Sequence, residues 1–214
     1  MRNWIPRVHG IALTRTSQAA IDAMIIAADS LPLRPSRLLT IAQAGRPIRL
    51  PFGFSHDRRR TLLGRGSKTF ASAQQAFQRW TMFDLGWVRV ANPDARIATG
   101  QLVAVEAHPL RLWTLNISRI VDVIRSENAF GFVYATTDLH VEEGEERFLL
   151  EFDGAQGEVW YDLEAVSRPR GALARLGFPF VRHFQHRFAL QSHSRMLEEL
   201  HSSARRRLTD TLNT

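Results

Sequence analysis

Apolar and polar residues alternate most regularly between residues 130 and 169. Phe148 and Leu150 lie two positions apart in one segment. In the next segment Val159, Tyr161 and Leu163 repeat this spacing of two. A period of two is typical of antiparallel strands with one buried face. Acidic residues and glycines at 142–145 and 153–157 separate the segments and predict chain reversals there. We therefore expect three strands joined as consecutive hairpins.

Earlier segments also have the apolar spacing of strands. They lie at 60–63, 87–90, 100–107 and 112–125. Asn92 and Pro93 follow the second of these segments, and Pro109 marks the end of the third, which is the chemistry expected of turns. Together with the three later segments, they predict an antiparallel meander.

Two other segments have helical spacing. Apolar residues recur every three or four positions in 68–85, as at Phe70 and Phe77, which predicts a helix with one apolar face. Near the end of the chain Phe180 and Phe184 begin a second apolar stripe, after a proline suited to the first turn of a helix. This last helix, with about 23 residues, would span roughly 35 Å and could lie across a curved sheet.

The predicted order is strand, helix, six further strands and a long helix. This is the order of the α+β helix-grip, or START-like, fold, in which a curved antiparallel sheet of about seven strands grips a long C-terminal helix. Such a fold characteristically leaves a cavity between the sheet and the helix, although a fold does not fix a function. We expect this domain to occupy residues 52–201.

Residues 1–51 form a less regular N-terminal extension. A short helix is predicted at 16–29, with Ser17 as its cap and Ile21 on its apolar side. Prolines then punctuate an irregular connection to the domain. At the other end, residues 202–214 are expected to form a basic tail.

The composition fits one folded domain without disulfides. A chain of 214 residues with 44% hydrophobic residues can bury roughly 70% of the surface that its unfolded form exposes. Cysteine is absent, which excludes disulfides, thiolate metal sites and cysteine nucleophiles. The longest apolar run, 19–28, contains Asp22 and is too short to cross a bilayer, and the first residues lack a signal-peptide core. We expect a soluble, cytoplasmic protein without a membrane span.

The net charge is +7, and 27 of the 28 basic residues are arginine. Arginine pairs well with phosphate and carboxylate, so nucleic acids and acidic ligands are candidate partners. The two basic clusters, 58–60 and 205–207, lie far apart in the chain, whereas nucleic-acid binding needs a concentrated basic stripe. Nucleic-acid binding is therefore disfavoured.

The sequence contains no complete motif for a nucleotide or a metal. Residues 64–69 resemble a phosphate-binding loop, but Ser67 separates the second glycine from Lys68 and the spacing is wrong. We interpret them as a tight turn and a helix cap. His183, His186 and His193 lie on the last helix, and the first two share a face, but the third ligand and the glutamate of a zinc site are not evident. We interpret all three as residues of the polar face of this helix. We expect no metal and no cofactor.

One polar group near a predicted hairpin is a candidate catalytic site. Tyr134, His140, Glu145 and Glu146 lie along one strand and the hairpin after it, and Arg119 lies on the neighbouring strand. A histidine beside a carboxylate can act as a general base, and a tyrosine can donate to a developing oxyanion. The alternative is an exposed acidic loop whose members meet only because they are hairpin neighbours.

A binding cavity would draw on aromatic side chains of the sheet and the last helix. Ligand pockets are mostly apolar, with a few converging polar groups. The expected ligand-binding residues are Arg119, Phe132, Tyr134, Phe148, Phe180 and Phe184. Asp162 and Glu164 alternate with apolar residues on one strand. We expect them to face solvent, and the alternative is an opposing arginine across the sheet.

Several short motifs resemble those of one bacterial and plant family. They are Leu-Gly-Arg-Gly at 63–66, Phe-Gly-Phe-Val-Tyr-Ala-Thr at 130–136, Gly-Glu-Glu-Arg-Phe at 144–148 and Ser-Arg-Pro at 167–169. Together, over residues 52–200, they resemble the uncharacterised family catalogued as domain of unknown function nineteen-ninety. Members usually carry Gly-His-Pro where this chain has Leu139-His140-Val141, so the histidine is kept and its neighbours differ. Because the family has no established activity, the resemblance implies an architecture and leaves the chemistry open.

Three functions are compatible with the sequence. The first is a non-catalytic binder that encloses a hydrophobic or amphipathic small molecule between the last helix and the sheet. The second is an enzyme, such as a cyclase, dehydratase or hydrolase, that uses the same cavity with His140 and Tyr134 as acid and base. The third, an arginine-rich binder of nucleic acid or of an acidic partner, ranks last. The ligand and the oligomeric state are left open.

Overall fold

The computed structural model describes residues 11–31, 39, 44, 46–137, 142–169 and 178–212. Its strands are β1 Ile11–Ala12, β2 Ser55–Arg65, β3 Val88–Val90, β4 Leu102–Ala107, β5 Trp113–Arg125, β6 Ala129–Thr136, β7 Glu142–Asp153 and β8 Glu158–Pro169. Its helices are α1 Gln18–Asp29, α2 Ser67–Gln78 and α4 Phe178–Leu212, and short 3-10 turns lie at η2 Thr81–Phe83 and η3 Pro109–Arg111.

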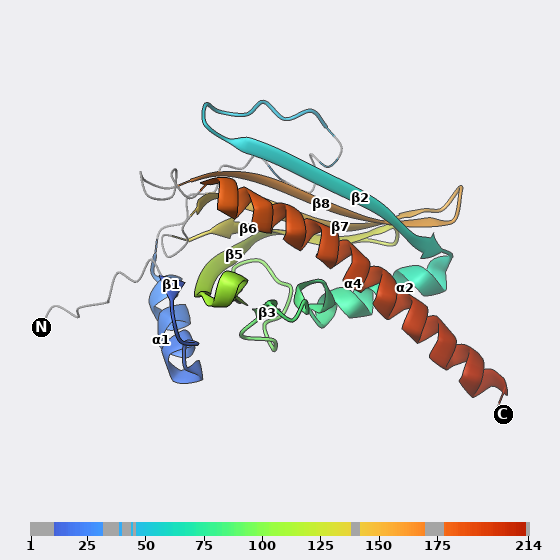
Figure 1. The fold of residues 1–214 in the computed structure, drawn as a ribbon. Coiled ribbons are helices and arrows are strands. Elements are labelled where there is room, and N and C mark those ends of the chain that lie inside the picture. The colour runs from blue at the N-terminus through green and yellow to red at the C-terminus, as the bar shows by residue number, and fades with distance from the viewer. Residues whose placement is uncertain are drawn as a thin grey trace, which may run out of the picture.

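The strands form one antiparallel sheet in the order β2-β8-β7-β6-β5-β4-β3, and β1 pairs with β5 outside this path. From β3 to β8 each strand pairs with its neighbour in sequence, and β2 returns to the free side of β8. Figure 1 shows α4 running along the face of the curved sheet, with α2 beside it. The predicted helix-grip fold is therefore confirmed, including the meander and the long final helix.

Two predicted boundaries differ from the structure. Residues 142–145, expected as a reversal, belong to β7, where Glu142 lies opposite Pro169 and Glu145 opposite Val166. Glu142 and Glu145 are buried there, and the carboxylate of Glu145 accepts from the backbone amide of Leu39. The segment from 202, expected as a tail, continues α4 to Leu212, since no glycine or proline interrupts it.

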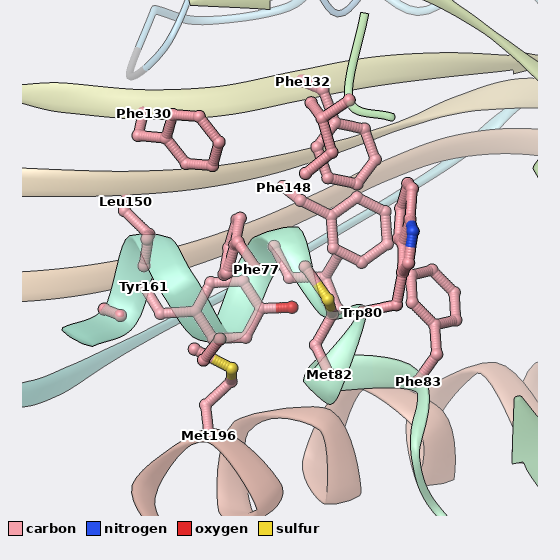
Figure 2. Packing of buried hydrophobic residues seen from close by; sticks show 14 of the residues in the cluster. Phe77, Trp80, Met82, Phe83, Phe130, Phe132, Phe148, Leu150, Tyr161 and Met196 are labelled. Carbon is pink, nitrogen blue, oxygen red and sulfur yellow. The ribbon is translucent and has the colours of Figure 1, made fainter. Parts of the chain in front are cut away.

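An aromatic core fills one half of the space between the sheet and its helices. Phe77 of α2 lies edge-on to Tyr161 of β8, with ring centroids 5.3 Å apart, and Phe132 stacks on Phe148 across β6 and β7 at 4.9 Å. Figure 2 shows these rings converging, with Met196 of α4 closing the cluster from the helix side. The core therefore excludes any guest from this half of the sheet.

The predicted helix over 68–85 is divided at Trp80. This residue has a left-handed backbone (φ 57°), which ends α2 and lets the chain turn into η2. Its buried indole N–H donates to the carbonyl of Ala95 at 3.0 Å. The turn directs Phe83 into the core, where its ring contacts Trp80. In a continuous helix the side chain of Phe83 would point in another direction, so the break brings one more aromatic ring into the core.

The opposite, convex face of the sheet is covered by the N-terminal extension and by charge pairs. Ser17 caps α1 as predicted, since its hydroxyl accepts from the amide of Ala20 at 3.3 Å. The expectation that Asp162 and Glu164 face solvent is wrong, because both are buried. Each pairs instead with an arginine of a neighbouring strand, Asp162 with Arg58 and Glu164 with the fully buried Arg147. These buried acids are thus paired with arginines.

Candidate functional site

A cavity of about 230 Å³ lies between the concave face of the sheet and the first turns of α4. One wall is apolar and consists of Phe83, Trp87, Val105, Val181, Phe184 and Phe188. The other is polar and includes Ser118, Tyr134, Thr136, Glu142, Glu146 and Gln185. This division suits a ligand with an apolar side and a few polar groups.

Tyr134 and Glu146 form the central polar pair of this wall. They lie opposite each other on β6 and β7, and the tyrosine hydroxyl donates to the glutamate carboxylate. Burial raises the pKa of Glu146 to about 7, although the bond from Tyr134 opposes this effect. Burial and the charge of Glu146 raise the pKa of Tyr134 well above its ordinary value. Near neutral pH the carboxyl can therefore exchange a proton while the tyrosine keeps its own.

Glu142 lies on the same face of β7, four residues before Glu146. The side-chain amide of Gln185 on α4 donates to it at 2.8 Å. Burial, followed by the charge of Glu146, raises the pKa of Glu142 to about 7. Two carboxyls close together in a cavity do not ionise independently, because each charge disfavours the other. The polar wall thus carries groups that donate or accept protons at neutral pH.

A second cavity, of about 430 Å³, lies between β2 and α4. It shares three lining residues, Glu146, Ala165 and Gln185, with the first cavity. Asp57 on β2 and Arg182 on α4 form an ion pair beside it. The two spaces are therefore neighbours along α4, separated by the side chains that both of them contact.

The structure brings only part of the predicted site together. Tyr134 and Phe184 line the first cavity, whereas Phe132 and Phe148 are fully buried in the core beside it. Phe180 is 66% exposed on α4. Binding by these residues stays a prediction, and the structure favours Tyr134 and Phe184.

Arg119 and the carboxylate of Glu145 have their partners on the convex face of the sheet. The guanidinium of Arg119 donates to the carbonyls of Ala28 and Asp29, at 3.2 and 2.8 Å, and so holds the end of α1 on the convex face. Glu145 borders the cavity, but its carboxylate accepts from the amide of Leu39 at 2.9 Å on that same far side. His140 lies outside the described residues. The partner of Tyr134 is thus Glu146 rather than Glu145.

The sequence analysis grouped Glu146 with Tyr134 as a candidate catalytic residue, but it did not select Glu142 or Gln185. Strand alternation supports the position of Glu146, because Phe148 points into the core and residues two apart share a face. The same alternation places Glu142 on this face, because Glu142, Gly144 and Glu146 follow one another at intervals of two residues. Gln185 offered no such signal, since its position depends on how α4 is rotated against the sheet.

Within the part of the chain that the structure describes, no group of three or more histidine, aspartate or glutamate side chains is placed to hold a metal ion. Over the same residues, no helix is long and apolar enough to cross a membrane.

Comparisons with known proteins identify related sequences. The family model described as "Domain of unknown function (DUF1990)" matches residues 40–195. A UPF0548 protein of Dictyostelium discoideum is 34% identical over 161 residues, which cover 70% of this chain and 74% of that protein. A UPF0548 protein of Arabidopsis thaliana is 31% identical over 157 residues, covering 71% and 76%. Among solved structures, the ginseng major latex-like protein 151 from Panax ginseng aligns with a TM-score of 0.42 at 9% identity, covering 68% of this chain and 97% of that one.

Proposed function

This chain belongs to the DUF1990 family, as its motifs predicted, and we propose that it binds a hydrophobic or amphipathic small molecule between its sheet and α4. The observation that supports this function most is the divided lining of the first cavity. Phe184 and Trp87 offer apolar surface on one side. Tyr134 and Glu146 offer a hydroxyl and a carboxyl on the other. A ligand that satisfies both walls has separate apolar and polar parts.

The size of the two cavities also supports a small-molecule ligand. Ligand pockets typically enclose about 300 to 1,000 Å³. The first cavity alone is smaller, at about 230 Å³, and the second adds about 430 Å³. Because they share lining residues, an elongated molecule can occupy both after small side-chain movements of Glu146 and Gln185.

Filling the shared space tests this function directly. Ala165 lines both cavities and lies opposite Glu146 on the sheet. We expect dodecanol to raise the melting temperature of the wild-type protein, since a ligand at a hundredfold excess over its Kd adds about 2.7 kcal/mol of stability. Ala165→Phe should remove this increase, because the ring would occupy the ligand's space.

The matched control is Ala155→Phe, which adds the same ring to the exposed turn between β7 and β8. It should respond to dodecanol as the wild type does. An equal response from Ala165→Phe would place the ligand outside the cavities and contradict the proposal.

An enzyme that uses the same cavity is the second candidate function. The raised pKa of Glu146 supports it, since a general acid or base works best with a pKa near the working pH. In this version Glu146 moves the proton, Tyr134 donates its hydrogen bond and keeps its own proton, and His140 stays a candidate partner. A compound that copurifies with the protein and is converted by it should still bind Glu146→Gln but no longer react. Unchanged conversion would remove Glu146 from the mechanism.

A further inference from the structure

The second cavity contains an arginine whose charge is not neutralised by a nearby acid. Arg59 lies on β2 opposite Leu163, which belongs to the concave core. Paired residues of antiparallel strands share a face, so Arg59 points towards α4, and it lines the second cavity. Among the residues that the structure describes, Arg59 has no hydrogen bond or ion pair.

The other charges near this arginine are already paired. Arg58 binds Asp162 on the convex face, and Arg60 binds Glu151 at 3.0 Å. Asp57, the acid on the same face of β2 as Arg59, is occupied by Arg182 of α4. Arg58 and Arg60 also border the second cavity, but each is paired with a carboxylate. Arg59 differs from them because no carboxylate of the described residues binds it.

A buried histidine with open hydrogen-bonding positions lies beside Arg59. His193 of α4 is only 3% exposed, and neither ring nitrogen has a hydrogen-bond partner. Its ring stacks on Tyr161 at 4.2 Å. Burial and then the charge of Arg59 lower its pKa to about 4, so the ring is neutral and carries one N–H donor. Buried polar groups without partners are rare in folded proteins and suggest a missing ligand or water.

His193 continues the row of α4 residues that lines the second cavity. Ala189 and Leu190 border that cavity, and His193 follows them by four and three positions, on the same side of the helix. His193 does not itself line the cavity, but it lies one turn beyond Ala189 and Leu190, and its ring stacks on Tyr161, two residues from the Leu163 that lies opposite Arg59.

We propose that Arg59 and His193 bind the anionic group, a carboxylate or a phosphate, of an amphipathic ligand whose apolar part occupies the first cavity. This inference rests on the proposed function and adds the charge of the ligand to it. A guanidinium binds either anion through two parallel N–H donors. The N–H of His193 would supply a third donor, which would give both residues the partner that they lack.

A series of ligands with one chain and different head groups tests the proposal. Isothermal titration would compare dodecanoate, dodecyl phosphate, dodecanol and dodecylamine below their micelle concentrations. We expect at least one anionic probe to bind the wild-type protein about ten- to a hundredfold more tightly than dodecanol does, as charge-assisted hydrogen bonds allow. The tighter of the two anions identifies the head group as a carboxylate or a phosphate.

Variants connect this preference to the two residues. Arg59→Gln should lose the preference for anions and still bind dodecanol, which shows that the cavity is intact. Arg59→Lys should keep part of it, because the charge remains and the fork is lost. His193→Phe keeps a ring on Tyr161 and should weaken only the anionic probes. Arg65→Gln is the control: Arg65 lies on the same strand, pairs with Glu158 at 2.7 Å and lines neither cavity.

Two results would overturn the proposal. One is wild-type protein that binds dodecanol or dodecylamine as tightly as the anions, and the other is Arg59→Gln that keeps the full preference. If none of the four probes binds the wild type, the proposed function itself fails and this inference fails with it. Binding of dodecanol without any preference for anions refutes the anion site alone.

Discussion

Glu146 shows how strongly the surroundings of one residue decide its chemistry. It lines both cavities, and its hydrogen bond comes from a tyrosine rather than from a cation. Its pKa of about 7 in the folded protein exceeds the ordinary value of 4.5. The folded protein therefore holds a proton on Glu146 at pH values where the unfolded chain has lost it.

This difference makes stability depend on pH. The contribution of the protonated Glu146 is complete below about pH 4.5 and is lost as the pH rises through about 7. We expect Glu146→Gln, which stays neutral and keeps the shape, to reduce the loss of stability between pH 5 and 8 by about 1 to 3 kcal/mol. Urea unfolding at a series of pH values measures this loss.

Tyr134→Phe is the companion variant. Because the bond from Tyr134 lowers the pKa of Glu146, its removal should move the pH-dependent loss to higher pH. Identical pH profiles for the wild type and Glu146→Gln would show that Glu146 does not titrate in this range. Part of the wild-type slope should persist in Glu146→Gln, since Glu142 also titrates near pH 7.

His193 should have the opposite pH dependence. Its pKa falls from 6.5 to about 4 on folding, so the stability that the neutral ring contributes is complete above pH 6.5 and is lost as the pH falls towards 4. The stability of His193→Phe relative to the wild type should therefore rise by about 1 to 3 kcal/mol on acidification over this range. A constant difference between the two unfolding curves would contradict the buried, neutral state of His193.

At the scale of elements, α4 has two parts with different roles. Its first turns carry Phe184 and Gln185 to the first cavity, and its later turns seal the core with Met196 and Leu200. Tyr161 connects the second part to β8, since its hydroxyl lies 2.9 Å from that of Ser192. One helix thus closes one half of the sheet and leaves the other half hollow.

Two phenylalanines that the sequence grouped as ligand-binding residues should behave differently. Phe148 is fully buried among other rings, whereas Phe180 is 66% exposed. We expect Phe148→Ala to cost about 3 to 5 kcal/mol of unfolding free energy, as large-to-small core substitutions do. Phe180→Ala should change stability by less than about 0.5 kcal/mol. Equal costs in chemical denaturation would show that the helix is rotated differently against the sheet.

The sequence predicted the elements well because their signals are local. Alternation identified the strands from β5 to β8, and stripes such as Phe180 and Phe184 identified α4. Neither pattern could show which part of α4 packs against the sheet, since the apolar stripe includes the exposed Phe180 as well as the buried Met196. The break at Trp80 was also missed, because a left-handed backbone at a tryptophan carries no sequence signal.

At the scale of the whole molecule, the arginines act largely within the fold. Arg147 is fully buried and pairs with Glu164, and Arg58 and Arg182 pair with acids on β8 and β2. Many of the positive charges are thus neutralised by internal acids instead of forming one basic surface. This arrangement gives no support to the nucleic-acid alternative.

The candidate site was less predictable than the fold for a physical reason. Tyr134 and Glu146 could be grouped from the sequence, but an exposed acidic loop was the alternative interpretation, because consecutive acidic residues usually face water. Only the packing of α4 and of the N-terminal extension against the sheet buries this segment. Contacts between elements far apart in sequence, such as Glu142 with Gln185, have no local signature.

The central claim is that a small molecule binds between the sheet and α4. A crystal structure of the protein with dodecanoate tests this claim most directly. The account predicts density for the chain between Tyr134 and Phe184, with the carboxylate directed towards Arg59. Density for dodecanoate only on the outer surface, with both cavities filled by water or by protein side chains, would contradict it.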